Sequence, residues 1–193
     1  MSDDKKEKKE EAPASWEKNL FDSRSVMIFG EINMELAQKV SAQLLALSFK
    51  NKDPIKVFIN SPGGHVESGD TIHDMLQFLD CPVKVIGTGW VASAGSLIYL
   101  GVKKENRYSL PNTRFLLHQP HGGMRGTAAD VKIQAEEMLK MRERINRIIA
   151  RETGNDYEKV AKDTERDYWL SPEDAKSYGI VGKIIRNISE INS

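Results

Sequence analysis

The chain has 193 residues, enough for one domain with a sizeable core and too few for two ordinary domains. Lysine plus arginine and aspartate plus glutamate both number 28, so the formal net charge is zero. A balanced charge, with no basic block beside an aromatic cluster, argues against a nucleic-acid-binding protein. No apolar run is long enough to span a membrane and no secretory signal is visible, so we expect a cytoplasmic protein.

The N-terminal segment differs in composition from the rest of the chain. Residues 1–14 are rich in lysine, aspartate and glutamate, and such a segment cannot bury enough apolar surface to offset the entropy of ordering. We therefore expect a disordered charged tail over residues 1–14 and a single domain over residues 15–193. The one cysteine, Cys81, cannot form an internal disulfide, and we interpret it as a small buried residue rather than a nucleophile.

The first half of the chain alternates between two apolar patterns. Short apolar runs that end at glycine or at turn residues predict strands at 25–30, 55–59 and 83–86. Apolar residues at helical spacing predict helices at 35–49 and through 72–79. Strand–helix units of this length indicate an α/β domain with a parallel sheet and helices on its faces.

The second half predicts shorter elements around one long helix. A buried helix is expected at 94–100 and a strand at 115–117. Near the C-terminus, Ser171-Pro172 opens a helix that Gly179 ends, and a strand follows at 180–185.

The long helix begins at Thr127, which is a favourable N-cap, and ends near Gly154. It is about twice the mean length of about 11–12 residues for a globular domain. An apolar side that includes Met138 and Ile145 indicates a contact between subunits. The alternative is a helix that lies along its own domain.

Ser93 is a candidate nucleophile because it stands between a predicted strand and the apolar helix that follows. A hydroxyl there benefits from the positive end of the helix, and the next amide can point at a developing oxyanion. The surrounding Gly89-Trp-Val-Ala-Ser-Ala-Gly95 is not the Gly-x-Ser-x-Gly elbow of the α/β-hydrolases, because Val91 takes the first glycine position. Taken alone, a serine at a helix start is more often an N-cap than a nucleophile.

His118 and Asp167 are candidates for the base and its orienting acid. His118 ends an apolar strand, where an imidazole that titrates near neutral pH can act as a general base. A core histidine bonded to a backbone carbonyl explains the same position equally well. Asp167 lies in a polar run in which Asp163 and Glu165 compete for the role.

Two further patterns are candidates for ligand binding. Gly63 and Gly64 form a tight turn whose bare backbone could approach a ligand, although a turn alone explains them. His118 and His121 show no third and fourth partner for a metal ion. No glycine-rich phosphate loop is present, so we expect neither a metal, nor another cofactor, nor ATP hydrolysis by this chain.

Taken together, these segments resemble the proteolytic subunit of the ATP-dependent Clp protease, over about residues 26–185. The segments that carry the resemblance are Ile59-Asn-Ser-Pro-Gly-Gly64, Val91-Ala-Ser-Ala-Gly95, Leu110-Pro-Asn112, His118-Gln-Pro120, Gly122-Gly123 and Asp163-Thr-Glu-Arg-Asp167. No segment identifies the family by itself, whereas the order and spacing of the segments together make the match specific.

The resemblance implies a serine endopeptidase with the triad Ser93, His118 and Asp167. It also implies oxyanion-hole amides at Gly64 and Ala94. The implied fold is a crotonase-like spiral of βαβ units in which the long helix is a protruding handle. The implied assembly is a homo-oligomer of two stacked heptameric rings, a tetradecamer that admits peptides and unfolded proteins.

The resemblance further implies a Clp AAA+ unfoldase partner, whose apolar loop would dock at Phe58, Phe78 and Tyr108. The charged tail departs from the apolar N-terminal loops usual in the family, and Lys56 stands near the docking residues where an aromatic residue is common. We therefore expect weak coupling to an unfoldase. Trp90 and Ala94 also replace the residues usual there. Ala94 should matter little because only its backbone amide is used, and the sequence offers no account of Trp90.

Two other functions remain open at this point. A crotonase-type acyl-CoA enzyme would share the spiral fold and a Gly-Gly oxyanion turn, but it needs no Ser-His-Asp set. A partner-dependent or structural subunit of a mixed assembly would keep the fold, and an intact triad does not exclude dependence on a second kind of subunit.

Overall fold

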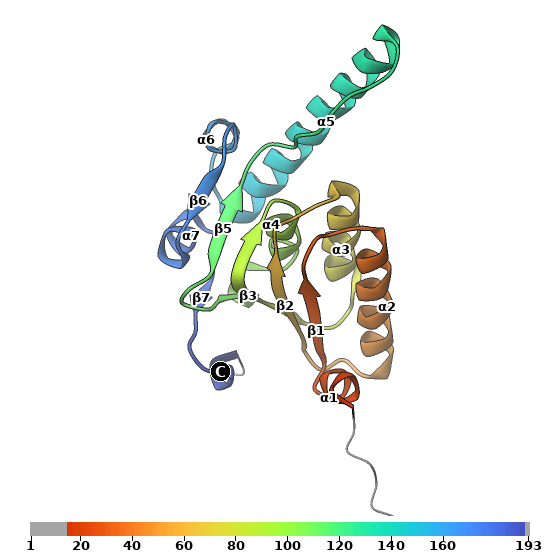
Figure 1. Ribbon diagram of the computed structural model, residues 1–193. Helices are drawn as coiled ribbons and strands as arrows, with labels where there is room; N and C mark the ends of the chain where they lie inside the picture. The colour runs from red at the N-terminus through yellow and green to blue at the C-terminus, as the bar shows by residue number, and fades with distance from the viewer. Residues whose placement is uncertain (1–14, 192–193) are drawn as a thin grey trace, which may run out of the picture.

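The structure is a computed structural model that describes residues 15–191. The tail expected over residues 1–14 lies outside the described residues. A seven-stranded sheet occupies the middle of the body, and one long helix projects from it (Figure 1).

The described residues form seven strands and seven α-helices. The strands are β1 (Ser25–Phe29), β2 (Ile55–Ser61), β3 (Val83–Ala92), β4 (Arg107–Ser109), β5 (Arg114–Leu117), β6 (Tyr168–Leu170) and β7 (Lys183–Ile184). The helices are α1 (Trp16–Asp22), α2 (Met34–Lys50), α3 (Val66–Phe78), α4 (Ala94–Tyr99), α5 (Ala128–Thr153), α6 (Tyr157–Asp163) and α7 (Pro172–Tyr178). Every element expected from the sequence is present, whereas α1, β4, α6 and β6 were not predicted.

The sheet branches at β3, which is longer than the sequence indicated. Its first part pairs with β4 and its second part pairs with β5, both in parallel. An irregularity between β2 and β3, where Ser61 pairs with Val91 instead of continuing the earlier register, accompanies the change of partner. The expected parallel sheet is present, and its one described antiparallel pair, between β5 and β6, was not predicted.

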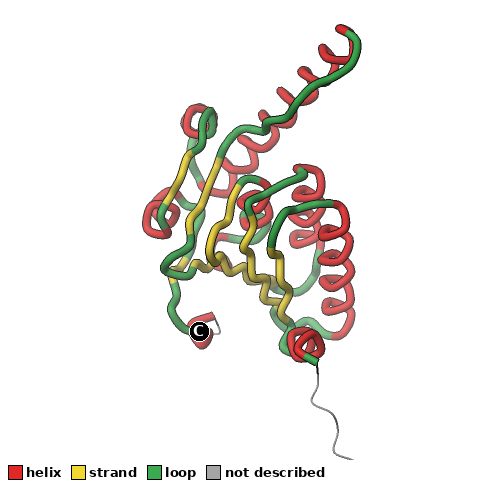
Figure 2. Tube along the Cα trace, in the orientation of Figure 1, coloured by secondary structure: helices red, strands yellow, loops and turns green. Residues whose placement is uncertain are grey.

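The helices α2, α3 and α4 lie beside the sheet (Figure 2), and the core packs between them and the strands. Side chains of β2 alternate between buried and half-buried, as the two-residue period of a strand requires. The buried side of α2 follows the helical period through Ala37, Val40, Leu44 and Leu47. All six residues of α4 are buried, which fixes the start of this helix firmly in the body.

Helix α5 begins with a capping box between Thr127 and Asp130 and ends at Gly154, which has a left-handed conformation. Only Asn146 and Ile149 of this helix are buried, and both lie near its C-terminal end. The N-terminal half therefore projects from the body, with the segment after β5 running beside it (Figure 1). Ile145 packs against the core of its own subunit, so it does not belong to the contact surface expected from the sequence.

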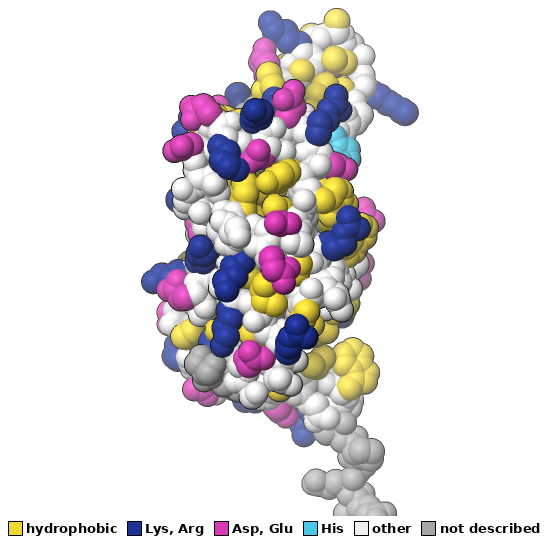
Figure 3. Space-filling view, turned by 90° about the vertical axis from the view of Figure 1, so that its left-hand side faces the viewer, with side chains coloured by type: hydrophobic (Ala, Val, Ile, Leu, Met, Phe, Trp, Pro, Cys, Tyr) yellow, Lys and Arg dark blue, Asp and Glu magenta, His cyan; other side chains and the backbone are white. Residues whose placement is uncertain are grey.

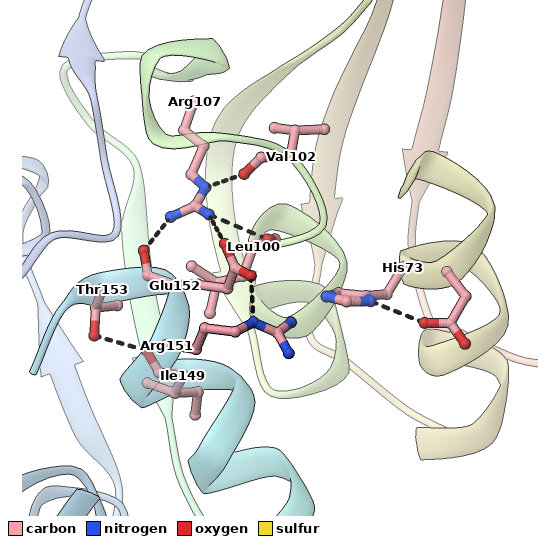
Figure 4. A network of polar contacts seen from close by, with 9 residues as sticks. His73, Leu100, Val102, Arg107, Ile149, Arg151, Glu152 and Thr153 are labelled. Atoms are coloured by element: carbon pink, nitrogen blue, oxygen red, sulfur yellow. Dashed lines mark hydrogen bonds and ion pairs between the residues drawn. The ribbon is translucent and has the colours of Figure 1, made fainter. Parts of the chain in front are cut away.

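A buried arginine attaches the C-terminal end of α5 to the sheet (Figure 4). Arg107 of β4 donates to the Glu152 carboxylate at 2.6 Å and to the Glu152 carbonyl at 2.9 Å. It also donates to the carbonyls of Val102 and Leu100. Because its side chain is only 1% exposed, the Glu152 carboxylate is the charge that compensates it.

The surface drawn in Figure 3 mixes positive, negative and apolar side chains, in keeping with the zero net charge. Within residues 15–191, no helix is both long enough and apolar enough to cross a membrane.

Candidate active site

Ser93 joins β3 to α4 in a conformation that is rare for a residue with a side chain. Its φ is 56° and its ψ is −122°, a combination that costs about 1–3 kcal/mol outside glycine. Its amide donates to the Leu116 carbonyl of β5 at 3.0 Å, which holds the turn in place. The side chain makes no capping hydrogen bond to α4. Ser93 thus occupies the N-cap position without capping the helix, and its hydroxyl is left to act on another group.

Gly63 lies directly against this serine. A Cβ added at Gly63 would stand 2.6 Å from the Ser93 Cβ and 2.9 Å from the Ala92 carbonyl oxygen. Gly63 also has a φ of 96°, which only glycine adopts readily. The glycine turn after β2 and the serine turn after β3 thus fit together only without a side chain at position 63.

His118 and Asp167 meet at the end of the β5–β6 ladder. Leu116 pairs with Trp169 and Leu117 with Tyr168, so the same antiparallel register places His118 opposite Asp167. The His118 Nδ1 atom is 3.7 Å from the Asp167 Oδ1 atom. This distance is an ion-pair contact and exceeds a normal hydrogen bond. The histidine side chain is 11% exposed and the aspartate side chain 65%.

Ser93 and His118 line one small pocket. The other walls are mostly apolar and come from α3, α4, the end of β5 and α5. Both the serine and the histidine are partly accessible from this pocket, so a substrate carbonyl could reach the serine while the imidazole is beside it. A largely apolar lining with a few polar groups is typical of a substrate site.

The protonation of His118 is biased by its surroundings. Burial lowers the pKa of His118, and the neighbouring His121 lowers it further. The Asp167 carboxylate acts in the opposite direction and raises it. The rings of His118 and His121 are 5.0 Å apart between centroids. The net effect favours the neutral imidazole, which is the form that accepts a proton.

The amides of Gly64 and Ala94 fit the oxyanion role that the resemblance implied. Hydrogen bonds from Ile32 N to Gly63 O and from His65 N to Ile32 O, both 2.8 Å, hold the backbone on each side of Gly64. Among the described backbone hydrogen bonds, none uses the amide of Gly64 or Ala94 as donor. Neither amide therefore has a described backbone acceptor.

Of the two competing carboxylates, Asp163 has other partners, whereas Glu165 lines a pocket together with His118 and Asp167. Asp163 accepts hydrogen bonds from Lys159 at 2.6 Å and from the Tyr178 hydroxyl at 2.9 Å. Glu165 contributes its carbonyl to Gln119. Within residues 15–191, no group of three or more His, Cys, Asp or Glu side chains could hold a metal ion. Cys81 is buried, as expected.

Two of the three residues expected to receive an unfoldase loop pack together. Phe58 and Tyr108 belong to one small apolar cluster with Ile86 between them in the sheet. Phe78 is at the end of α3, is 76% exposed and is not part of that cluster. Lys56 lies on β2 opposite Lys84 of β3, which brings two positive charges close to the cluster.

The partners of Trp90 could not be predicted from the sequence. In the structure its indole stacks on that of Trp169, with ring centroids 6.4 Å apart and planes 6° from parallel. The signal that could have indicated this contact was the pair of aromatic residues in the segments that carry Ser93 and Asp167.

Comparisons with known proteins extend over nearly the whole chain. The family model described as Clp protease matches residues 7–188. The "ATP-dependent Clp protease proteolytic subunit 3" of Rhizobium meliloti (strain 1021) is 59% identical over 191 residues, covering 98% of both chains. The "ATP-dependent Clp protease proteolytic subunit 2" of Pseudomonas aeruginosa is 52% identical over 168 residues, covering 87% of this chain and 84% of the relative.

Solved structures agree with the fold. The structure of "ClpP1 from Listeria monocytogenes" has a TM-score of 0.82 and 57% identity, and the match covers 91% of this chain and 98% of that chain. A mutant form of the same protein has a TM-score of 0.85. The α/β fold implied by the sequence resemblance is therefore confirmed.

Proposed function

Because the chain belongs to the Clp protease family of proteolytic subunits, we propose that it is a serine endopeptidase with Ser93, His118 and Asp167 as its triad. The observation that carries this assignment is the free hydroxyl of Ser93, strained at a strand–helix turn, in one pocket with His118. The ladder register that places Asp167 opposite the same histidine supports it.

In the proposed reaction, the Ser93 Oγ atom attacks the carbonyl carbon of the scissile peptide bond while His118 accepts the hydroxyl proton. The C–N bond then breaks, and the histidine gives the proton to the leaving amine. A water molecule, activated by the same histidine, hydrolyses the acyl-enzyme and restores the serine. Asp167 orients the imidazole and stabilises its charged form during both proton transfers.

The unused amides of Gly64 and Ala94 would bind the oxyanion of the tetrahedral intermediate. Backbone donors of this kind are already oriented before reaction, so they stabilise the developing charge without reorganisation. Since position 94 contributes only its N–H, alanine there is compatible with catalysis.

We propose that the chain acts in the cytoplasm as two stacked seven-membered rings joined through α5. The projecting N-terminal half of α5 carries the exposed apolar residues Val131, Ile133 and Leu139, which a partner subunit would cover. A Clp AAA+ unfoldase would supply unfolded protein and dock near Phe58, Phe78 and Tyr108.

A partner-dependent subunit of a mixed assembly is the second candidate. The 3.7 Å separation and the 65% exposure of Asp167 favour it, because both leave room for a neighbouring subunit to tighten the pair. A crotonase-type acyl-CoA enzyme is not supported, since the family relatives are proteolytic subunits.

The test compares hydrolysis of a short fluorogenic peptide by wild type, Ser93→Ala, Asp167→Asn and Asp163→Asn. We expect no hydrolysis by Ser93→Ala, a loss of orders of magnitude for Asp167→Asn and near-normal rates for Asp163→Asn. Full activity of Ser93→Ala, or damage by Asp163→Asn alone, would overturn the assignment. A wild-type chain that is inactive alone and active after mixing with a second kind of subunit would favour the second candidate.

A further inference from the structure

We propose that Trp90, Arg114 and Trp169 form a positioning cluster that holds the Asp167 strand in register beside His118. This inference rests on the proposed function, because it concerns the same histidine–aspartate pair. These three side chains act through Asp167 and are positioning residues.

Each member of the cluster comes from a strand that leads to one triad residue. Trp90 lies on β3, three residues before Ser93, and Arg114 lies on β5, four residues before His118. Trp169 lies on β6, two residues after Asp167. The three strands are neighbours in the sheet, in the order β3, β5, β6 (Figure 1).

The contacts join the strands in pairs. Trp90 and Arg114 are direct partners in the parallel β3–β5 ladder. The guanidinium carbon of Arg114 is 4.2 Å from the centroid of the Trp169 ring, within the range of a cation–π contact. The nearly parallel Trp90 and Trp169 rings extend the link from β3 to β6 across β5.

Strand β6 needs such a link because it is short. It has three residues, and among residues 15–191 it pairs with β5 alone. Asp167 lies just outside this ladder, so a slip by one residue would turn its carboxylate away from His118. Trp169 is two residues from Asp167 and therefore points to the same face of the strand. A contact that fixes Trp169 also fixes the direction of the carboxylate.

The segment that precedes Asp167 is held by other contacts, which do not involve the cluster. Gln119 donates its amide to the Thr164 carbonyl and its side-chain nitrogen to the Glu165 carbonyl, both at 2.7 Å. These bonds attach the loop before Asp167 to the chain just after His118. The loop before Asp167 is thus held by the hydrogen bonds of Gln119. The strand after Asp167 is held by the cluster of Trp90, Arg114 and Trp169.

The experiment compares Trp169→Ala and Trp90→Ala with the conservative Trp169→Phe. For both alanine variants we expect kcat to fall about tenfold or more while KM changes less than about twofold, because only orientation is lost. Trp169→Phe should recover most of the rate, since a ring remains to stack. Sedimentation of every variant at wild-type mass shows that assembly is intact, and Trp90→Ala keeps the test valid should Trp169→Ala fail to fold.

Two readouts separate positioning from general stabilisation. The acid limb of the pH–rate profile should move to lower pH in Trp169→Ala, because Asp167 raises the pKa of His118 and its contact is lost. The rate of Ser93 labelling by a serine-reactive phosphonate should be as slow in Trp169→Ala/Asp167→Asn as in Asp167→Asn alone.

Additive losses in that double variant, or an unchanged acid limb, would overturn the positioning role. If the proposed function itself is wrong, Ser93→Ala retains peptide hydrolysis, whether or not the cluster of Trp90, Arg114 and Trp169 is intact.

Discussion

Ser93 and Gly63 illustrate how two backbone conformations depend on each other at the scale of single residues. Gly63→Ala would place a Cβ within 3 Å of both the Ser93 Cβ and the Ala92 carbonyl, at a positive φ. We expect it to lower the free energy of unfolding by about 1–3 kcal/mol and to displace the serine, so that peptide hydrolysis is lost.

Chemical unfolding and peptide hydrolysis measure the two effects of Gly63→Ala. Gly123→Ala is the stability control, because a Cβ there would meet nothing within 4 Å. Equal stability and activity in the two variants would show that the contact between the turns is unimportant.

His121 provides a second test at this scale, through the pKa of His118. Burial and the charge of His121 both lower that pKa, so His121→Leu removes one lowering influence and raises it. A larger fraction of His118 is then protonated in mild acid, where it cannot act as a base. The acid limb of the pH–rate profile should therefore move to higher pH in His121→Leu, whereas Asp167→Asn should move it to lower pH. A limb unchanged in both variants would show that His118 is not the titrating base.

The individual site residues could not have been assigned from local pattern alone. Ser93 resembled an N-cap, His118 a core histidine and Asp167 a surface carboxylate, and only their joint spacing identified a family. Their relation in space depends on the β5–β6 register, which the sequence did not indicate because β6 was not predicted. The partners of Trp90 were missed for the same reason.

Helices and strands could be predicted from the sequence where the pattern of apolar residues was long enough to show its period. The seventeen residues of α2 and the seven of β2 display clear helical and strand periods. The three-residue strands β4 and β6 are too short to show a period, and they form because a neighbouring strand already supplies an edge. The branching of the sheet at β3 depends on β4 as well as on β5, so it could not be predicted without β4.

The attachment of α5 to the sheet gives a prediction at the scale of elements. Burial lowers the pKa of Arg107 and the Glu152 carboxylate raises it, so the carboxylate offsets part of the cost of burying the charged guanidinium. Glu152→Ala should therefore lower the free energy of unfolding by about 2–3 kcal/mol, because it leaves a buried guanidinium without a counter-charge.

Glu143→Ala is the matched control, since it removes the partner of Arg147 on the exposed surface of the same helix. Exposed pairs contribute at most about 1 kcal/mol. Chemical denaturation that gave equal losses for both variants would contradict the anchoring role of Arg107.

Assembly is the main expectation at the scale of the whole molecule. Ile133 and Leu139 are 60% and 62% exposed on the projecting half of α5. Ile133→Lys and Leu139→Lys should leave the subunit folded and reduce the sedimenting species to single rings or smaller, because a charge would be buried at the contact. Lys132→Ala, on the same helix, should sediment as wild type. Wild-type mass for both lysine variants would place the ring contact elsewhere.

Coupling to an unfoldase is the second expectation at this scale. Lys56 and Lys84 lie side by side near the cluster of Phe58 and Tyr108, so an apolar loop that docks there must desolvate positive charge. We expect weak ATP-dependent degradation of a folded, tagged substrate, and stronger degradation by Lys56→Tyr. Rapid degradation by the wild type would contradict this expectation.

The most direct test of the proposed triad is covalent labelling of the intact protein by a serine-reactive phosphonate, located by peptide mass spectrometry. An activated nucleophile reacts where an ordinary surface serine does not. The account predicts one adduct per subunit, on Ser93, with labelling strongly slowed by His118→Ala and absent in Ser93→Ala. An adduct on another residue, or equal labelling in His118→Ala, would contradict it.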